Sequence, residues 1–182
     1  VEGKWQDQWY DTKKSGGKFQ RQDSLFTHKI GGDSEFKPES GRYHLYVSLA
    51  CPWAHRTLIL RKLKQLEEHI SISVVHPDML DQGWQFATVN NGFAAATEDH
   101  LYGSQYMHQI YTRAKPDITT RVTVPVLWDK QTQQIVNNES AQIVRILNSA
   151  FNDLTGNQDD YYPQALQADI DDINESFCFC GS

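Results

Sequence analysis

The sequence predicts an α/β fold in which a mixed four-stranded sheet is flanked by helices. Three observations carry this prediction: the order of strand-like and helix-like stretches, a cysteine directly after the first strand, and a proline near the start of the third. Two strands joined by a helix form a right-handed crossover and lie parallel. Two later strands joined by a short turn form an antiparallel hairpin that completes the sheet.

The first strand and helix surround the cysteine. Apolar and polar residues alternate over 43–48, the pattern of a strand with one face more buried. Pro52 fits the first turn of a helix, where its missing N–H leaves no bond unmade. Apolar spacing of i, i+4 and i+7 predicts an amphipathic helix that continues to about Glu68. Its expected apolar face is Ile59, Leu63 and Leu66.

Cys51 lies at the N-terminus of this helix, where free N–H groups and the helix dipole favour a thiolate. His55 and Arg56 add positive charge nearby. The position where a dithiol Cys-x-x-Cys site has its second cysteine is Ala54, so a resolving thiol must come from elsewhere. Glutathione, the abundant small thiol of the cytoplasm, is the first cofactor to test. The alternative is a buried, inert cysteine that packs as a small hydrophobe.

The middle of the chain alternates again over 70–75, which predicts the second strand. Residues 76–98 form a connection longer than is usual inside a compact domain, which suggests a functional insertion, and it carries Trp84. Successive i+4 steps of apolar residues then predict a helix over 99–113. A third strand is expected at 122–128.

Pro125 within that third strand has two interpretations: an edge or bulge position, or a cis-proline. After a short loop, a fourth strand is expected at 133–136. Residues 137–140 then cap a helix that runs to Phe151. A polar connection over 152–163 precedes a last helical start. This order of elements is that of a thioredoxin-like fold.

Composition excludes several classes of protein. The chain has 182 residues, 39% of them hydrophobic, and 17 basic against 23 acidic residues give a net charge of −6. This argues against nucleic acid or an anionic membrane as a partner, and no apolar run approaches the ~20 residues of a membrane span. Three cysteines make a poor disulfide framework, which fits a reducing, cytoplasmic location. No metal site is expected, since the Cys178–Cys180 pair offers only two ligands.

The first 42 residues show no sustained periodicity and are interpreted as a loop-rich N-terminal arm. Its large aromatic residues predict that it packs on the folded body rather than remaining disordered. These residues are Trp5, Trp9, Tyr10 and Phe19.

Several long stretches closely resemble one family. They are Arg42–Thr57, which contains Cys-Pro-Trp-Ala-His-Arg, then Arg121–Asp129, Ile135–Ser140, Trp9-Tyr10-Asp11 with Gly16–Phe19, and Asp160–Pro163. The chain resembles the Xi class of glutathione transferases, the glutathionyl-hydroquinone reductases, up to about residue 175.

The resemblance implies glutathione-dependent reduction of S-glutathionyl-hydroquinones to hydroquinones. The Cys51 thiolate attacks the thioether sulfur to give a mixed disulfide with glutathione, which a second glutathione resolves. It also implies three parts: an arm (1–42), a thioredoxin-like glutathione-binding domain (43–152), and a connection with the start of a helical domain (153–182). The rest of the family's all-helical second domain is expected to be absent, and with it much of the quinone pocket and of the family's homodimer contact.

By position, the resemblance implies a glutathione site of five residues. Val124 offers its backbone to the cysteinyl part, as an added strand does. Ser140, at a helix start, suits the γ-glutamyl carboxylate, and Glu139 the ammonium. Arg121 suits a carboxylate, and Trp84 covers the ligand. Considered one at a time, Arg121 is equally well explained as a surface charge and Trp84 as a loop aromatic. Glu139 and Ser140 are then an ordinary N-cap pair.

Two other functions remain open. One is a general monothiol, glutaredoxin-like deglutathionylase that works with the thioredoxin-like domain alone. The other is a non-catalytic, glutathione-transferase-like binding module, for which loss of thiolate reactivity at Cys51 would be the sign.

Overall fold

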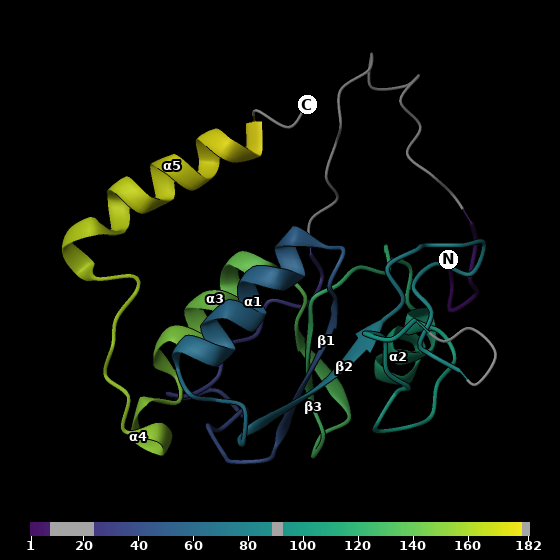
Figure 1. Ribbon diagram of the computed structural model, residues 1–182, viewed down its shortest axis with the longest axis horizontal. Coiled ribbons are helices and arrows are strands. Elements are labelled where there is room, and N and C mark those ends of the chain that lie inside the picture. The colour runs from purple at the N-terminus through teal and green to yellow at the C-terminus, as the bar shows by residue number, and fades with distance from the viewer. Residues whose placement is uncertain (8–23, 89–92, 180–182) are drawn as a thin grey trace.

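A four-stranded sheet in the order β2-β1-β3-β4 organises the molecule. The structure, a computed structural model, describes residues 1–7, 24–88 and 93–179 (Figure 1). The strands are β1 (Tyr43–Ser48), β2 (Ile70–Val75), β3 (Val126–Asp129) and β4 (Gln134–Asn137). β1 and β2 are parallel, whereas β3 is antiparallel to both β1 and β4. The predicted mixed sheet is therefore confirmed.

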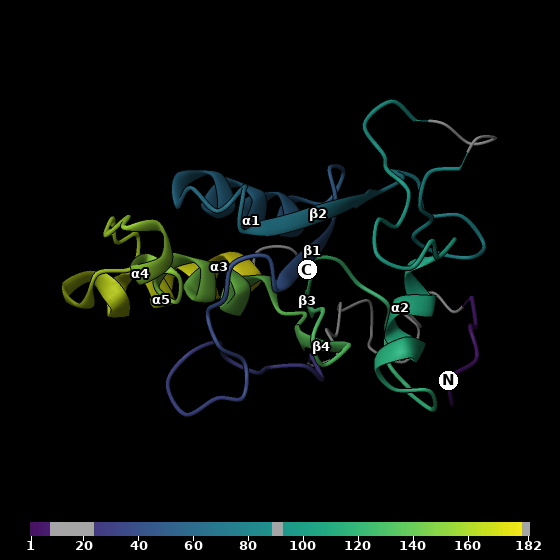
Figure 2. The ribbon, with the colours of Figure 1, turned by 90° about the horizontal axis from the view of Figure 1, so that it is seen from below.

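Helices cover both faces of the sheet. Helices α1 (Pro52–Leu63) and α3 (Ser140–Ser149) pack against each other on one side, and α2 (Met107–Ala114) lies on the other (Figure 2). Between them lies one core of buried side chains. Its largest fully buried aromatic members are Trp128, Tyr43, Tyr46, Tyr111, Phe36, Phe86 and Phe151.

The expected difference between the two faces of β1 is wrong, because all six of its residues are buried. β1 is a central strand with helices on both sides, and such strands are buried on both faces. Polar residues of β1 are accommodated by hydrogen bonds. His44, for example, bonds to the hydroxyls of Ser71 and Ser73 at 2.7 and 2.9 Å.

Helix α1 is shorter than predicted and presents a different face to the core. It ends at Leu63 rather than about Glu68, and Gln65 takes a left-handed conformation with φ of 57°. Ile59 and Leu63, expected on the buried face, are 46% and 42% exposed. The small residues Ala54 and Thr57 are buried instead, since they allow the helix to lie close to the sheet. The helical period was read correctly, but its phase was wrong.

The helix predicted over 99–113 begins only at Met107. The preceding segment is a loop that is held by the buried carboxylate of Asp99. This carboxylate accepts hydrogen bonds from the backbone of Leu101 and Ser104 and from the Tyr46 hydroxyl, and Gly103 has a φ of 63°. Because short polar side chains compete with the helix for backbone groups, local apolar spacing did not decide the structure here.

The region around Pro125 resolves the open alternative. The Val124–Pro125 bond is cis, and β3 starts after it at Val126, not at 122. Helix α3 ends at Ser149 rather than Phe151. The connection expected to be irregular contains a short helix, α4 (Asn152–Thr155).

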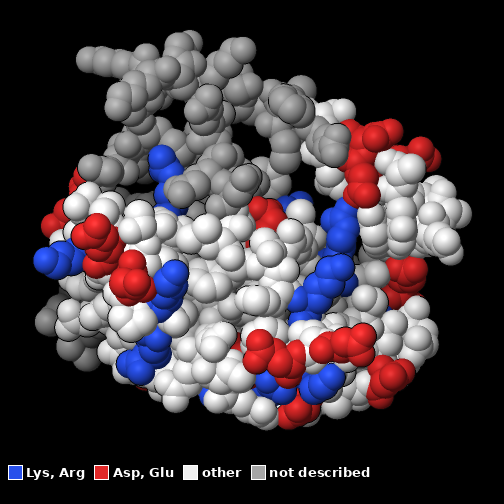
Figure 3. Space-filling model, turned by 180° about the vertical axis from the view of Figure 1, so that it is seen from behind, with Lys and Arg blue, Asp and Glu red and all other residues white. Residues whose placement is uncertain are grey.

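The C-terminal part lies on the side of α1 and α3 that faces away from α2 (Figure 1). It comprises a 3₁₀ turn, η1 (Gln164–Leu166), and α5 (Gln167–Phe179). Arg145 of α3 forms an ion pair with Asp171 of α5, whose other oxygen accepts the Tyr162 hydroxyl at 2.6 Å. At the upper right of Figure 3, where α5 lies in this view, acidic side chains gather beside a row of basic ones.

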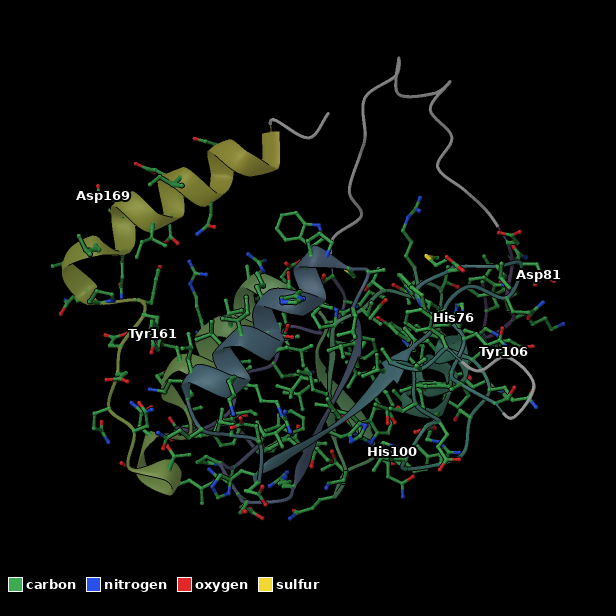
Figure 4. The ribbon with its side chains drawn as sticks, viewed as in Figure 1. His76, Asp81, His100, Tyr106, Tyr161 and Asp169 are labelled. Atoms are coloured by element: carbon green, nitrogen blue, oxygen red, sulfur yellow. The ribbon has the colours of Figure 1, made fainter. Side chains whose placement is uncertain are left out.

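Trp5 packs on the folded body, as predicted for the arm. Its indole Nε1 donates to the backbone oxygen of Asp81 at 2.8 Å, and its ring stacks on His108 at 5.0 Å. Figure 4 places Asp81 and Tyr106 on the α2 side, where this contact is made. Trp9, Tyr10 and Phe19 lie outside the described residues. Within the part of the chain that the structure describes, no helix is long and apolar enough to cross a membrane.

Candidate functional site

One edge of the sheet collects most of the residues that the sequence singled out. β1 and β4 end at this edge, and β3, which is antiparallel to both, begins there: Tyr46 pairs with Val126, and Leu127 with Asn137. The segments that follow β1 and β4 and precede β3 therefore meet. They carry Cys51, Val124, Glu139 and Ser140.

Cys51 is the N-cap residue of α1, with extended backbone (φ −98°) and no side-chain cap. Its backbone N–H donates to the Ser48 carbonyl at 3.2 Å, and its carbonyl accepts from His55 at 2.9 Å. Its sulfur is half-buried and lies 3.7 Å from the Val124 carbonyl oxygen. A thiol in this position borders the backbone N–H groups of a helix start, which have no acceptor one turn earlier in the helix.

The backbone that faces Cys51 is braced from the other side of the sheet. Val124 itself is buried. The Tyr111 hydroxyl of α2 donates to the Thr123 carbonyl at 3.0 Å and accepts from the Asn138 side chain at 3.2 Å. The sequence analysis did not identify Tyr111 and Asn138 as site residues. The only available signal was a tyrosine on the apolar face of a helix, which usually means core packing.

Glu139 and Ser140 begin α3. Glu139 is its N-cap, and one carboxylate oxygen accepts the Ala141 N–H at 3.4 Å while the other accepts the Ser24 hydroxyl at 3.1 Å. Ser140 is only 1% exposed, and its hydroxyl oxygen accepts a 2.6 Å hydrogen bond from Arg56 of α1. Arg56 was noted in the sequence only as a nearby charge, so this contact is new.

Trp84 and Arg121 belong to the connections before and after α2. The Trp84 carbonyl accepts the Met107 N–H at 2.9 Å, and its side chain packs partly against the core. Arg121 is half-buried on the segment that leads to Val124. The structure thus places these two residues on the segments that adjoin α2, away from the helix starts that carry Cys51 and Ser140 in the sequence.

Two histidines, His44 and His108, are packed within the fold. Burial lowers the pKa of His44 to about 3, so this ring is neutral between its two serine partners. Burial also lowers the pKa of His108, which is stacked between Trp5 and Tyr106. Among residues 1–7, 24–88 and 93–179, no three His, Cys, Asp or Glu side chains gather as metal ligands do. Cys180, of the pair near the C-terminus, lies outside these ranges.

Comparison with known proteins gives a consistent result. The family model described as glutathione S-transferase, N-terminal domain, matches residues 50–150. The chain is 53% identical over 182 residues to the glutathionyl-hydroquinone reductase YqjG of Escherichia coli. This match covers 96% of this chain and 55% of the relative. The chain thus spans about half the length of the curated relatives it matches.

Solved structures agree. The Xi glutathione S-transferase of Phanerochaete chrysosporium superimposes with a TM-score of 0.83 at 51% identity, over 86% of this chain and 53% of that one. The glutathione-bound structure of YqjG from Escherichia coli superimposes with a TM-score of 0.74 at 55% identity, over 80% and 46% of the two chains. The chain therefore belongs to the glutathione S-transferase family. Residues 50–150 form the N-terminal domain of that family, and the relatives include glutathione transferases of the Xi class.

Proposed function

We propose that this chain carries the glutathione site and the nucleophile of a glutathionyl-hydroquinone reductase. The observation that supports this most directly is the placement of Cys51 at the start of α1, with its sulfur 3.7 Å from the Val124 carbonyl oxygen. The similar E. coli protein is named for this activity and has been solved with glutathione bound. The site would act in the cytoplasm, where glutathione is abundant.

The reaction proceeds in two exchanges at one sulfur. The Cys51 thiolate attacks the sulfur of the glutathionyl-hydroquinone, and the bond between sulfur and ring carbon breaks. The electron pair stays with the carbon, which takes up a proton to give the hydroquinone, and Cys51 becomes a mixed disulfide with glutathione. A second glutathione thiolate attacks this disulfide, which restores Cys51 and releases oxidised glutathione.

Glutathione would bind along the edge that carries Cys51. The Val124 backbone pairs with the cysteinyl part in the manner of an added strand. The start of α3 receives the γ-glutamyl end, with Ser140 at its carboxylate and Glu139 at its ammonium. Arg121 takes a carboxylate of the tripeptide and Trp84 covers it. Ala54, fully buried where a second thiol would stand, leaves glutathione to resolve the disulfide.

A general glutaredoxin-like deglutathionylase is the second candidate. The observation that favours it is that all these residues lie within 43–152, so the proposed thiol site draws on none of the relatives' unmatched length. The boundaries 1–42, 43–152 and 153–182, and a homodimer of the full-length protein, are likewise proposals. The binding module without catalysis is the outcome if Cys51 does not react.

The test is reduction of a glutathionyl-hydroquinone by this chain with excess glutathione, beside its Cys51→Ser variant. We expect hydroquinone and oxidised glutathione to form in equal amounts, and only with Cys51 present. Turnover of a glutathionylated peptide but not of the glutathionyl-hydroquinone would assign the second candidate. A folded chain that captures no glutathione on Cys51 from oxidised glutathione would contradict both enzymatic functions.

A further inference from the structure

Arg56 connects the helix of the nucleophile to the helix that begins at Ser140. It lies on α1, between one and two turns after Cys51, and its Nη2 donates to the Ser140 hydroxyl oxygen at 2.6 Å. Its guanidinium also lies over the ring of Trp53, 4.8 Å from the ring centre. The two helices pack against each other, so this bond joins their N-terminal ends.

The bond determines how the Ser140 hydroxyl can be used. A hydroxyl has one proton to donate and lone pairs to accept, whereas a guanidinium can only donate. Because Arg56 occupies a lone pair of Ser140, the hydroxyl proton remains available for another acceptor. Ser140 is the first residue of α3, and in this turn the Gln142 N–H bonds to the Glu139 carbonyl at 3.0 Å while the Ala141 N–H has only a long bond of 3.4 Å to the Glu139 carboxylate. An anion that reaches these N–H groups is therefore met by an oriented O–H as well.

The position of the charge supports the same assignment. A cation near a helix N-terminus is disfavoured by the helix dipole, and here a guanidinium contacts the first residue of α3. The Glu139 carboxylate at the same helix start offsets part of this cost, and an anion that binds there adds a further favourable interaction with the guanidinium. Charge-assisted hydrogen bonds of this kind are also stronger than neutral ones.

We propose that Arg56 is a positioning residue of the glutathione site: it orients the Ser140 hydroxyl and supplies positive charge for the γ-glutamyl α-carboxylate. This inference rests on the proposed function. It predicts that Arg56 contributes to the affinity for ligands that carry this carboxylate. A purely structural contact between α1 and α3 would affect only the stability of the fold.

The test compares two ligands: glutathione, and 4-aminobutyryl-cysteinyl-glycine, which lacks only the α-carboxylate. Binding is measured by calorimetry in the Cys51→Ser background, so that no mixed disulfide forms. Arg56→Met removes the charge and the donors but keeps most of the side-chain stem. We expect it to bind glutathione about tenfold more weakly or worse, since hydrogen bonds to charged groups are among the strong ones, and to bind the analogue as before.

Arg145→Met is the matched control. Arg145 is an arginine of the adjoining helix α3 whose partners are Asp171, the Tyr162 ring and the Ala141 carbonyl oxygen. We expect this variant to lose thermal stability and to keep the preference for glutathione. We also expect Ser140→Ala to lose the preference for glutathione over the analogue. Adding Arg56→Met to Ser140→Ala should weaken glutathione binding little further, because the two side chains act together.

Equal weakening of both ligands by Arg56→Met, or unchanged binding of glutathione, would overturn the inference while leaving the proposed function intact. If the unsubstituted chain binds neither ligand, the proposed function fails first. Should Arg56→Met not fold, Arg56→Gln, which removes the charge but keeps a polar side chain, carries the test with Ser140→Ala. Reduced preference in both variants supports the inference, and an unchanged preference in either contradicts it.

Discussion

The two ends of the sheet differ in how far their polar groups are buried and paired. At the end where β1 starts and β3 finishes, Arg42 is 6% exposed and Asp129 fully buried, and two hydrogen bonds of 2.9 and 2.7 Å join them. Thr132 and Glu39 complete this network. At the opposite end, Cys51 is half-buried and begins a helix without a side-chain cap. We call the first the closed end, where charges are paired within the fold, and the second the open end, where we propose that glutathione binds.

The largest effect on stability is expected at the closed end. Asp129→Ala leaves the guanidinium of Arg42 buried without its main partner, which costs about 3–5 kcal/mol. We expect this loss in the free energy of unfolding, measured with urea. Arg42→Met combined with Asp129→Ala should recover part of it. In contrast, Cys51→Ser should change stability little and abolish glutathione capture, and similar unfolding losses from both single substitutions would break the comparison.

Tyr111 tests whether buried hydrogen bonds hold the backbone that faces Cys51. Tyr111→Phe removes the hydroxyl that joins Thr123 and Asn138, and buried groups left unpaired cost about 1–3 kcal/mol. We expect lower stability and a slower reaction of Cys51 with oxidised glutathione, because the Val124 carbonyl that faces the sulfur is no longer held. Tyr43→Phe is the control, since that hydroxyl bonds to the Lys37 carbonyl. It should lower stability without slowing the reaction.

The closed end also predicts an acid dependence. Burial alone would raise the pKa of the Asp129 carboxyl, but hydrogen bonds from Arg42 and Thr132 outweigh it and hold this pKa below its ordinary value. A carboxyl with a depressed folded pKa stabilises the fold above its unfolded pKa of about 4, and this stabilisation is lost as pH falls through the folded value. We therefore expect the unfolding free energy of Asp129→Asn to fall less steeply on acidification. Parallel pH profiles would contradict the assignment.

The smallest effect is expected at the arm. Trp5→Ala removes the stack on His108 and the hydrogen bond to Asp81, and such aromatic contacts contribute about 0.5–1.5 kcal/mol beyond burial. Gly83→Ala disturbs the packing of Trp5 without changing Trp5 itself, because a Cβ at position 83 would lie 2.7 Å from the Trp5 ring. We expect Trp5→Ala to lower the free energy of unfolding slightly, and Gly83→Ala to increase the solvent exposure of Trp5, measured by fluorescence quenching. Trp5 quenching that stays unchanged in Gly83→Ala would show that the arm is held elsewhere.

The sequence alone determined the order of the strands along the chain, and it predicted the candidate nucleophile and, through the family resemblance, the candidate ligand residues. Strands β1 and β2 and the hairpin could be read from short apolar runs and turn residues, because these signals are local. Cys51 stood out because a strand, a cysteine and a proline follow each other directly. The N-cap role of Glu139 was one of its two readings, and the structure bears it out.

Only the tertiary structure decided which face of α1 is buried, where α2 begins, and how Arg56 is used. Ile59 and Leu63 have the right spacing for a buried face, yet α1 turns Ala54 and Thr57 to the core because only small side chains fit against the central strand. The bonds of Asp99 to Leu101 and Ser104 override a helical pattern. Arg56 and Ser140 are 84 residues apart, and no local pattern reveals that two helix starts meet, because that depends on how the whole sheet brings them together.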